Sequence, residues 1–258
     1  MYARRTAVLG LFVLLFIKPV FGADLTREAV QEILRRATPH RPADFSGKSL
    51  EKLDLSHLEF RGAKLAGANL YAARLEGADF SGADLTGANL NLAWVIRANF
   101  RGANLSDASL QGLVVSMGME TSAAEAPIFA GANLSRARII ARLSWGDLHG
   151  ANFANAQMGA DMKNQSMGLM RADLSNADLA GANFAGADLG HALLRFAKLM
   201  GANLRGARLV RADLSGANLT GADLTDADAS EADFGAAVLK AVRGLDKLRG
   251  SPPMGLNP

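Results

Sequence analysis

A five-residue repeat constrains this chain more than any other feature. From Ala63 onward the sequence reads AKLAG ANLYA ARLEG ADFSG ADLTG ANL, so alanine returns at every fifth residue and Leu or Phe follows two places later. The central apolar residues keep one phase from Phe45 to Val115 and one phase from Leu169 to Leu239, with two shorter groups between them in shifted phases. Because an overlooked repeat leads to a wrong fold, this pattern has to be explained first.

A period of five matches neither the 3.6 residues of an α-helix nor the alternation of a strand, so each unit must turn a corner before the pattern begins again. Within a unit, Ala and the following Leu point inward and the Asn or Asp between them points outward. The last position is often glycine, as at Gly77 and Gly82, which tolerates the backbone angles of a tight bend. The repeat therefore predicts a coil of short extended pieces around an apolar axis.

Residues 20 apart test whether four units make one turn, since adjacent coils stack about 4.8 Å apart like neighbouring strands. Phe60, Phe80 and Phe100 have this spacing and form an expected aromatic ladder. Charges alternate at the same spacing in two outward series, Asp44, Lys64, Asp84 and Asp188, Arg208, Asp228. Opposite charges on neighbouring strands are favourable. Two like-charged pairs, Asp213 with Asp233 and Glu59 with Asp79, oppose this register, but the balance favours four units per turn.

The literal segments ADLSG, ANLTG and ADLTD between Ala212 and Asp226 resemble the pentapeptide-repeat family. The resemblance covers about residues 45 to 239 and implies an all-β fold, a right-handed quadrilateral parallel β-helix. The stability of such a solenoid is a sum of contacts between neighbouring coils, and both ends need covering.

The chain is expected to divide into segments around this solenoid. A helix from Leu25 to Ala37, with Thr26 as its N-cap, is predicted to cover the first coil. Leu239, Val242, Leu245 and Leu248 suggest a short C-terminal cap helix. The expected segments are a signal peptide (1–22), capping helix and linker (23–42), β-helix (43–115), loop insertion (116–127), β-helix with an irregular break near 159–166 (128–241), and a C-terminal cap and tail (242–258).

The first 22 residues match a secretory signal peptide, with Arg4 and Arg5 before an apolar run from Ala7 to Ile17. This run is shorter than the about 20 residues that span a bilayer, and no stable membrane insertion is expected after cleavage. An uncleaved tether or a buried terminal helix remains the alternative. Removing these residues leaves 25 Lys and Arg against 25 Asp and Glu, so the formal charge of +3 on the whole chain comes from the signal peptide. The neutral mature chain predicts no nucleic-acid partner. The expected location is the bacterial periplasm or the extracellular space.

Catalytic and cofactor signals are weak. The four histidines, His40, His57, His149 and His191, lie in different segments, and no catalytic motif accompanies them. We expect no enzyme activity and no cofactor. Met158, Met162, Met167 and Met170 could bind Cu(I) in an exported protein, because soft thioethers select this ion, but methionine also fills irregular gaps in a core. No metal site is assigned.

An outward apolar patch is the candidate partner site. Leu92, Trp94, Ile96 and Val114 occupy positions that are polar in most other units, beside the 116–127 insertion. Trp94 and Val114 are 20 residues apart and are therefore expected to stack in adjacent coils. Exposed apolar clusters indicate a partner or a covering segment. The insertion could fold back over the patch, so both interpretations stay open.

Three functions follow as alternatives. The leading one is an exported, non-catalytic scaffold that binds an unidentified protein. The family resemblance implies a second, a DNA-mimic modulator of DNA gyrase, although the neutral mature chain and its export signal depart from that pattern. The third is a methionine-rich periplasmic copper-binding accessory protein. The resemblance also implies that a homodimer could form end to end through the C-terminal coils.

Overall fold

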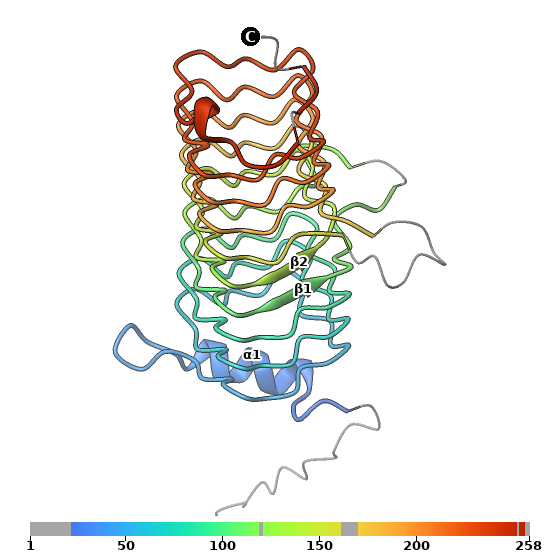
Figure 1. Cartoon of the computed structure of the whole chain (residues 1–258). Helices are drawn as coiled ribbons and strands as arrows, with labels where there is room; N and C mark the ends of the chain where they lie inside the picture. The colour runs from blue at the N-terminus through green and yellow to red at the C-terminus, as the bar shows by residue number, and fades with distance from the viewer. Residues whose placement is uncertain (1–21, 119–120, 161–169, 252, 256–258) are drawn as a thin grey trace, which may run out of the picture.

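The protein forms a rod in which the chain winds repeatedly around one axis (Figure 1). The computed structural model describes residues 22–118, 121–160, 170–251 and 253–255. Coils stack through parallel bridges between outward residues, as in the series Asp44 to Lys64 to Asp84. The 20-residue register holds wherever the repeat is uninterrupted. This arrangement confirms four units per turn and the right-handed quadrilateral parallel β-helix.

The bridges define four faces that the chain visits in order. Only two segments of the described chain are long enough to form regular strands, β1 (Ser109–Gln111) and β2 (Arg138–Ile140). These two strands are parallel, with Leu110 opposite Ile139. Elsewhere each face contributes about one bridged residue per coil, because the chain must turn again after each five-residue unit.

The interior is a column of Ala, Leu and Phe side chains. The central residues of the regular units, such as Leu65 and Leu204, are fully buried. The rings of Phe60 and Phe80 stack with centroids 4.6 Å apart, and those of Phe80 and Phe100 with centroids 5.1 Å apart. The ladder predicted from the 20-residue spacing is confirmed.

The outward Asn and Asp side chains have a structural task at the corners. The Oδ1 atom of Asn152 accepts a hydrogen bond of 3.1 Å from the Ala154 backbone N–H, which holds the start of the turn. Its Nδ2 atom donates to Asn133 Oδ1 in the preceding coil at 3.1 Å. The same bond recurs along one face, which we call the asparagine face, through Asn104, Asn133, Asn152, Asn183 and Asn203. Each amide thus joins its own turn to the neighbouring coil.

The two like-charged pairs that opposed the register are compensated by arginines. Arg61 pairs with both Glu59, at 2.9 Å, and Asp79, at 2.6 Å. Arg195 forms an ion pair with Asp213. A positive side chain from the adjacent corner therefore reduces the repulsion that the spacing alone suggested.

Helix α1 (Arg27–Arg35) lies across the first coil (Figure 1). The Thr26 side chain accepts a hydrogen bond from Ala29 N at 3.3 Å, so the predicted N-cap is confirmed. Val30 is fully buried against the core, and Leu25, Ile33 and other residues of the predicted stripe pack there partly buried. The helix covers apolar side chains that the first coil would otherwise expose.

The C-terminal end differs from the prediction. A cap helix does not form; a single 3-10 turn, η1 (Leu245–Lys247), interrupts a coil that otherwise continues. Arg243, Arg249 and Met254 still form parallel bridges with the preceding coil. The every-third-residue pattern that suggested a helix belongs instead to side chains that lie partly buried at the end of the core: Leu239, Val242, Leu245 and Leu248. The β-helix therefore extends beyond residue 241 to Met254.

Replacing Phe80 with Ala is expected to reduce the free energy of unfolding by about 3–5 kcal/mol, because it leaves a cavity between two stacked rings. Phe80→Leu is the matched control, since Leu fills the same position in most units, and it should be tolerated much better. Urea unfolding followed by circular dichroism measures both. Equal losses in the two variants would contradict the aromatic ladder as the source of the stability.

Acid is expected to destabilise the rod through its turn-capping aspartates. Hydrogen bonds from the Thr225 hydroxyl, at 2.6 Å, and backbone N–H, at 3.0 Å, lower the pKa of Asp223. Its folded pKa lies below the unfolded value of about 3.9, so its contribution is present above that pH and disappears as pH falls through the folded pKa. Urea midpoints should fall between about pH 5 and pH 2. Asp223→Asn keeps the acceptor but cannot titrate, so its midpoint should fall less than that of the parent.

Candidate interaction surface

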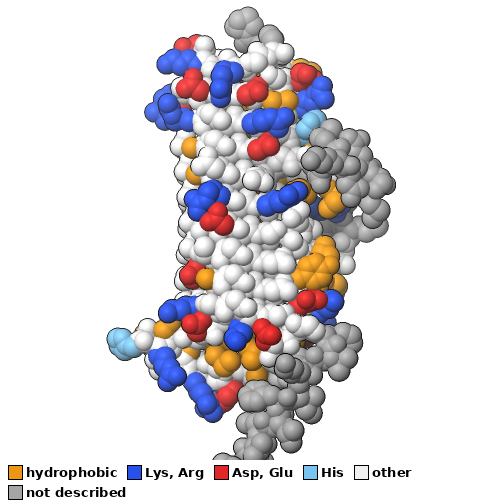
Figure 2. Space-filling view, turned by 60° about the horizontal axis from the view of Figure 1, so that its bottom comes forward, with side chains coloured by type: hydrophobic (Ala, Val, Ile, Leu, Met, Phe, Trp, Pro, Cys, Tyr) orange, Lys and Arg blue, Asp and Glu red, His pale blue; other side chains and the backbone are white. Residues whose placement is uncertain are grey.

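One face of the rod is less regular than the other three, and we call it the interrupted face. Its outward positions, in order from the N-terminal coil, are Asp54, Arg74, Trp94, Val114, Arg142, Asp173, Leu193, Asp213, Asp233 and Met254. The interrupted face lies opposite the asparagine face, because one other face separates the two on each side of the rod. In Figure 2 a large group of hydrophobic side chains lies at one edge of the rod, with others at the opposite edge and over the first coil, whereas the broad surface between the edges is mostly uncharged and polar or backbone.

Three changes in the repeat adjoin this face. The insertion at 116–127 leaves it after Val114, and the ladder resumes at Ile128 on the next face. The second insertion enters it, because Gln157 is followed in the ladder by Asp173. Between Arg138 and Arg142 the unit is one residue short. The described arms of both insertions leave the rod from the same side (Figure 1).

The ladder itself breaks on this face. Val114 bridges to Trp94 below it, and Arg142 bridges to Asp173 above it, but no bridge joins Val114 to Arg142. At the same level the other three faces continue without a gap, as Asn99 with Ile128 and Asn104 with Asn133 show. Two adjacent coils are therefore in register on three sides and separated on the fourth.

The side chain of Leu113 offers a physical reason for the gap. Leu113 occupies the first position of its unit, which is alanine in each preceding unit back to Ala63. Small alanines there let the coils close, whereas a leucine needs more volume than the tightly packed wall provides. The short unit before Arg142 removes the residue that would complete the corner. Both changes favour an opening at this point.

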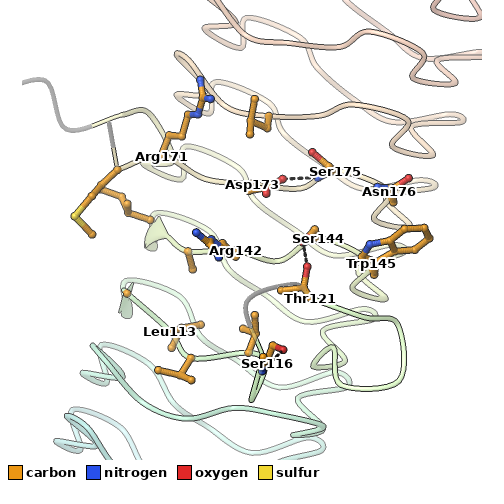
Figure 3. A pocket seen from close by; sticks show the side chains of 18 residues that line it. Leu113, Ser116, Thr121, Arg142, Ser144, Trp145, Arg171, Asp173, Ser175 and Asn176 are labelled. Carbon is orange, nitrogen blue, oxygen red and sulfur yellow. Dashed lines mark hydrogen bonds between the residues drawn. The ribbon is translucent and has the colours of Figure 1, made fainter. Parts of the chain in front are cut away.

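A pocket of about 850 Å³ occupies the opening. Its deep part consists of nearly buried core residues, Leu113, Val115, Ile140 and Ala141. Its outer part carries polar and large side chains, and Figure 3 shows Arg142 and Arg171 on one side of it and Trp145 with Asn176 on the other. The Thr121 and Ser144 hydroxyls are hydrogen-bonded between them. The volume is within the range of about 300–1,000 Å³ that ligand pockets have.

The predicted patch is found only in part. Leu92 is exposed and lies over Gly112 of the next coil, while Trp94 and Val114 are half-buried and bridged as expected. Ile96 is fully buried although it is not part of the interior column, so its predicted exposure is wrong. The Glu125 carbonyl accepts a hydrogen bond of 2.8 Å from Arg97 N, which places the returning arm of the insertion beside Ile96.

Trp94 is further shielded by Arg74, whose guanidinium carbon lies 5.7 Å from the centroid of the indole ring. This distance is within the range of a cation–π contact. The insertion therefore reaches the corner at Ile96, but it does not bury the rest of the predicted patch.

Sequence reasoning missed an exposed tryptophan at a corner of this face. Trp145 is 48% exposed at the corner after Arg142, in a left-handed backbone conformation with φ of 64°. A tryptophan in a position that glycine often fills was the available signal. Further exposed apolar side chains on this face or at its corners are Leu92, Met117, Met170, Phe196 and Met254.

The pocket has a positive side. Neither Arg142 nor Arg171 forms an ion pair with another described residue, and Asp173 is the one carboxylate among the described residues that line the pocket. Nearby, burial lowers the pKa of His191, and the positive charges of Arg211, Arg208 and Arg171 lower it further. His191 is therefore neutral at pH 7 and does not add to the charge of the pocket.

The described residues contain no group of three or more His, Asp or Glu side chains that could hold a metal ion. Met158 is a fully buried core residue, as expected of a methionine that fills a gap, and Met170 is exposed. Met162 and Met167 lie outside the described residues. The proposed thioether group is therefore divided, and copper binding stays a prediction without support from Met158.

Comparison with known proteins identifies the class. The family model for pentapeptide repeats matches in 8 copies, at residues 54–91, 83–113, 169–206 and 197–235. The chain belongs to the pentapeptide-repeat family. Members of this family are generally non-catalytic structural or interaction proteins. Fold and family together define a repeat scaffold.

Among solved structures, the chain is similar to HetL, a pentapeptide repeat protein involved in heterocyst differentiation regulation from the cyanobacterium Nostoc sp. strain PCC 7120. The alignment has a TM-score of 0.61 and 26% identity, and it covers 85% of this chain and 94% of HetL. No curated protein sequence matches the chain significantly.

Two further alignments are weaker. Full-length QnrB1, a plasmid-mediated fluoroquinolone resistance protein, aligns with a TM-score of 0.24 and 20% identity over 78% of this chain and 90% of QnrB1. A pentapeptide repeat protein from the Arabidopsis thaliana thylakoid lumen aligns with a TM-score of 0.21 and 29% identity over 45% of this chain and 65% of its own. These two scores are too low to support an argument.

The two tryptophans should differ in their access to a soluble quencher. Trp94→Phe leaves only the exposed Trp145, and Trp145→Phe leaves only Trp94, which is half-buried beside Arg74. Acrylamide should quench the fluorescence of the first variant more strongly than that of the second. The reverse order would show that Trp145 is covered in solution.

Proposed function

We propose that the protein is an exported, non-catalytic repeat scaffold that binds another protein through the interrupted face. The observation that carries the proposal is the uneven distribution of exposed apolar side chains: Trp145 and Met170 line the pocket at the opening, and most of the others lie along the same face of the rod. Six of the eight exposed large hydrophobic side chains among the described residues lie on this face or at its corners.

The composition of this surface suits a protein partner. Tryptophan, methionine and arginine are enriched in protein interfaces, and hot spots are enriched in Trp and Arg. Trp145, Met170, Arg142 and Arg171 all line the same pocket. The opposite face, in contrast, is a ladder of asparagines that bond to one another. A partner would therefore gain more by burying the interrupted face.

Export rests on the predicted signal peptide, and the packing at the start of the described chain is compatible with its removal. The Asp24 N–H donates to Ser49 O at 2.7 Å, and Ser49 N–H donates to Asp24 Oδ2 at 2.7 Å. Cleavage before Ala23 would leave these contacts and helix α1 intact. The predicted signal peptide lies outside the described residues apart from Gly22. No helix of the described residues is long and apolar enough to cross a membrane.

The gyrase alternative has less support. Outward charges alternate in sign along part of the rod, as in the bridged series Asp188, Arg208 and Asp228. Arginines accompany the like-charged pairs Glu59–Asp79 and Asp213–Asp233, so the described residues do not form a continuous acidic surface like that of DNA. A periplasmic location would also separate the protein from gyrase.

A homodimer through the C-terminal coil stays a prediction. Val238 is 47% exposed and Leu239 only half-buried at that end, so apolar surface is available there.

Site-specific crosslinking in living cells tests the proposed function. A photo-crosslinking amino acid at position 145 should give a specific adduct with an envelope protein, whereas the same group at position 183 on the asparagine face should not. Mass determination of the N-terminus should give a periplasmic chain that starts near Ala23. A cytosolic chain that still begins at Met1 would contradict export, and equal adducts from both positions would contradict the interrupted face as the binding surface.

A further inference from the structure

The opening in the interrupted face exposes unpaired strand groups. One coil earlier, Val114 N–H donates to Ala93 O at 2.9 Å, and Val95 N–H donates to Val114 O at 2.8 Å. The corresponding groups of the next rung are Leu113 O and Val115 N–H, and neither has a hydrogen-bond partner among the described residues. On the other side of the gap, the N–H and C=O of Arg142 also have no hydrogen-bond partner among the described residues.

These four groups have the arrangement of a free strand edge. In the regular coils, each outward residue bonds to two main-chain groups of the preceding coil, which lie on either side of the residue that it bridges to. Asp173, for example, bridges to Arg142, donates to Ala141 O and accepts from Leu143 N. One residue of an added strand can satisfy Leu113 and Val115 in the same way. Unpaired strand edges bind extended peptides through main-chain hydrogen bonds, while side-chain pockets determine which peptide is chosen.

The side chains around the edge indicate the chemistry of that peptide. The nearly buried Leu113, Val115 and Ile140 provide an apolar floor for one side chain of an extended segment. Arg142 and Arg171 lie on the same side of the pocket (Figure 3) without an ion-pair partner among the described residues. Because alternate residues of a strand point to opposite sides, an apolar residue directed to the floor places its neighbours toward the rim, where an acidic side chain can meet an arginine.

We propose that the opening between Val114 and Arg142 binds an extended segment of the partner protein, with alternating apolar and acidic residues, by strand addition. This inference rests on the proposed function and identifies the part of the partner that the interrupted face recognises. The guanidinium groups select the acidic residues, since charge-assisted hydrogen bonds are the stronger ones. Trp145 packs against an apolar side chain at one end of the bound segment.

Binding of defined peptides to the purified mature chain tests the proposal. The probe is a capped, fluorescein-labelled peptide with the sequence Val-Asp-Val-Glu-Val-Asp-Val, and fluorescence anisotropy measures its Kd. The comparison peptides replace the acidic residues with Lys or carry N-methyl groups on alternate backbone amides. The acidic peptide should bind, and both comparison peptides should bind at least about tenfold more weakly, because each loses charge-assisted or main-chain hydrogen bonds.

Variants of the protein locate the binding. Arg142→Gln and Arg171→Gln should each weaken the acidic peptide about tenfold, as expected for the loss of one charge-assisted hydrogen bond. Lys64→Gln is the matched control, because it removes a positive charge from the asparagine face, and should leave Kd unchanged. Equal effects of all three variants would reveal non-specific attraction and overturn the proposal. In the Trp94→Phe variant, the fluorescence of Trp145 should change on binding.

Other outcomes separate the proposal from its alternatives. If N-acetyl-aspartate amide competes as well as the whole peptide, the pocket binds a carboxylate alone and strand addition is wrong. Undiminished binding of the N-methylated peptide has the same meaning. If no peptide binds but crosslinking at position 145 still yields a partner, the proposed function stands and this inference is overturned.

Discussion

The structure depends on main-chain hydrogen bonds between residues that lie one coil apart. Each short extended piece is far too small to form a stable strand alone, so every unit is stabilised by the unit above and the unit below. The inward Ala and Leu allow the coils to approach, and the outward Asn and Asp hold the turns and, along one face, join neighbouring coils. Helix α1 supplies the covering that the first coil lacks.

An interruption in such a rod has local consequences. The insertions and the short unit shift the register from 20 residues to other spacings, yet the ladder recovers on three faces within one coil. The fourth face absorbs the mismatch and opens beside Leu113. The same residues that disturb the coil, together with Arg142, Trp145 and Arg171, surround the resulting pocket. Recognition on a rigid scaffold commonly resides where the regular structure is broken.

Sequence reasoning identified the coil and its register because both follow from short-range periodicity. The Phe60, Phe80 and Phe100 ladder, the Thr26 cap and the Trp94 to Val114 pair all follow from spacing alone. It failed at Ile96, because the insertion that returns beside this residue is distant from it in the sequence. It failed again at the C-terminus, where apolar residues at every third position suited a helix equally well, although stacking on the preceding coil favoured further rungs.

By itself the sequence determined the fold, the number of units per turn and the inward or outward direction of most side chains, since a strict five-residue period leaves one way to bury alanine and leucine. Only the tertiary structure decided where the ladder opens and which residues meet there. Leu113, Arg142, Trp145 and Arg171 lie in three separate tracts of the chain. Their meeting depends on how two insertions and one missing residue are accommodated, and that depends on contacts between coils rather than on any local pattern.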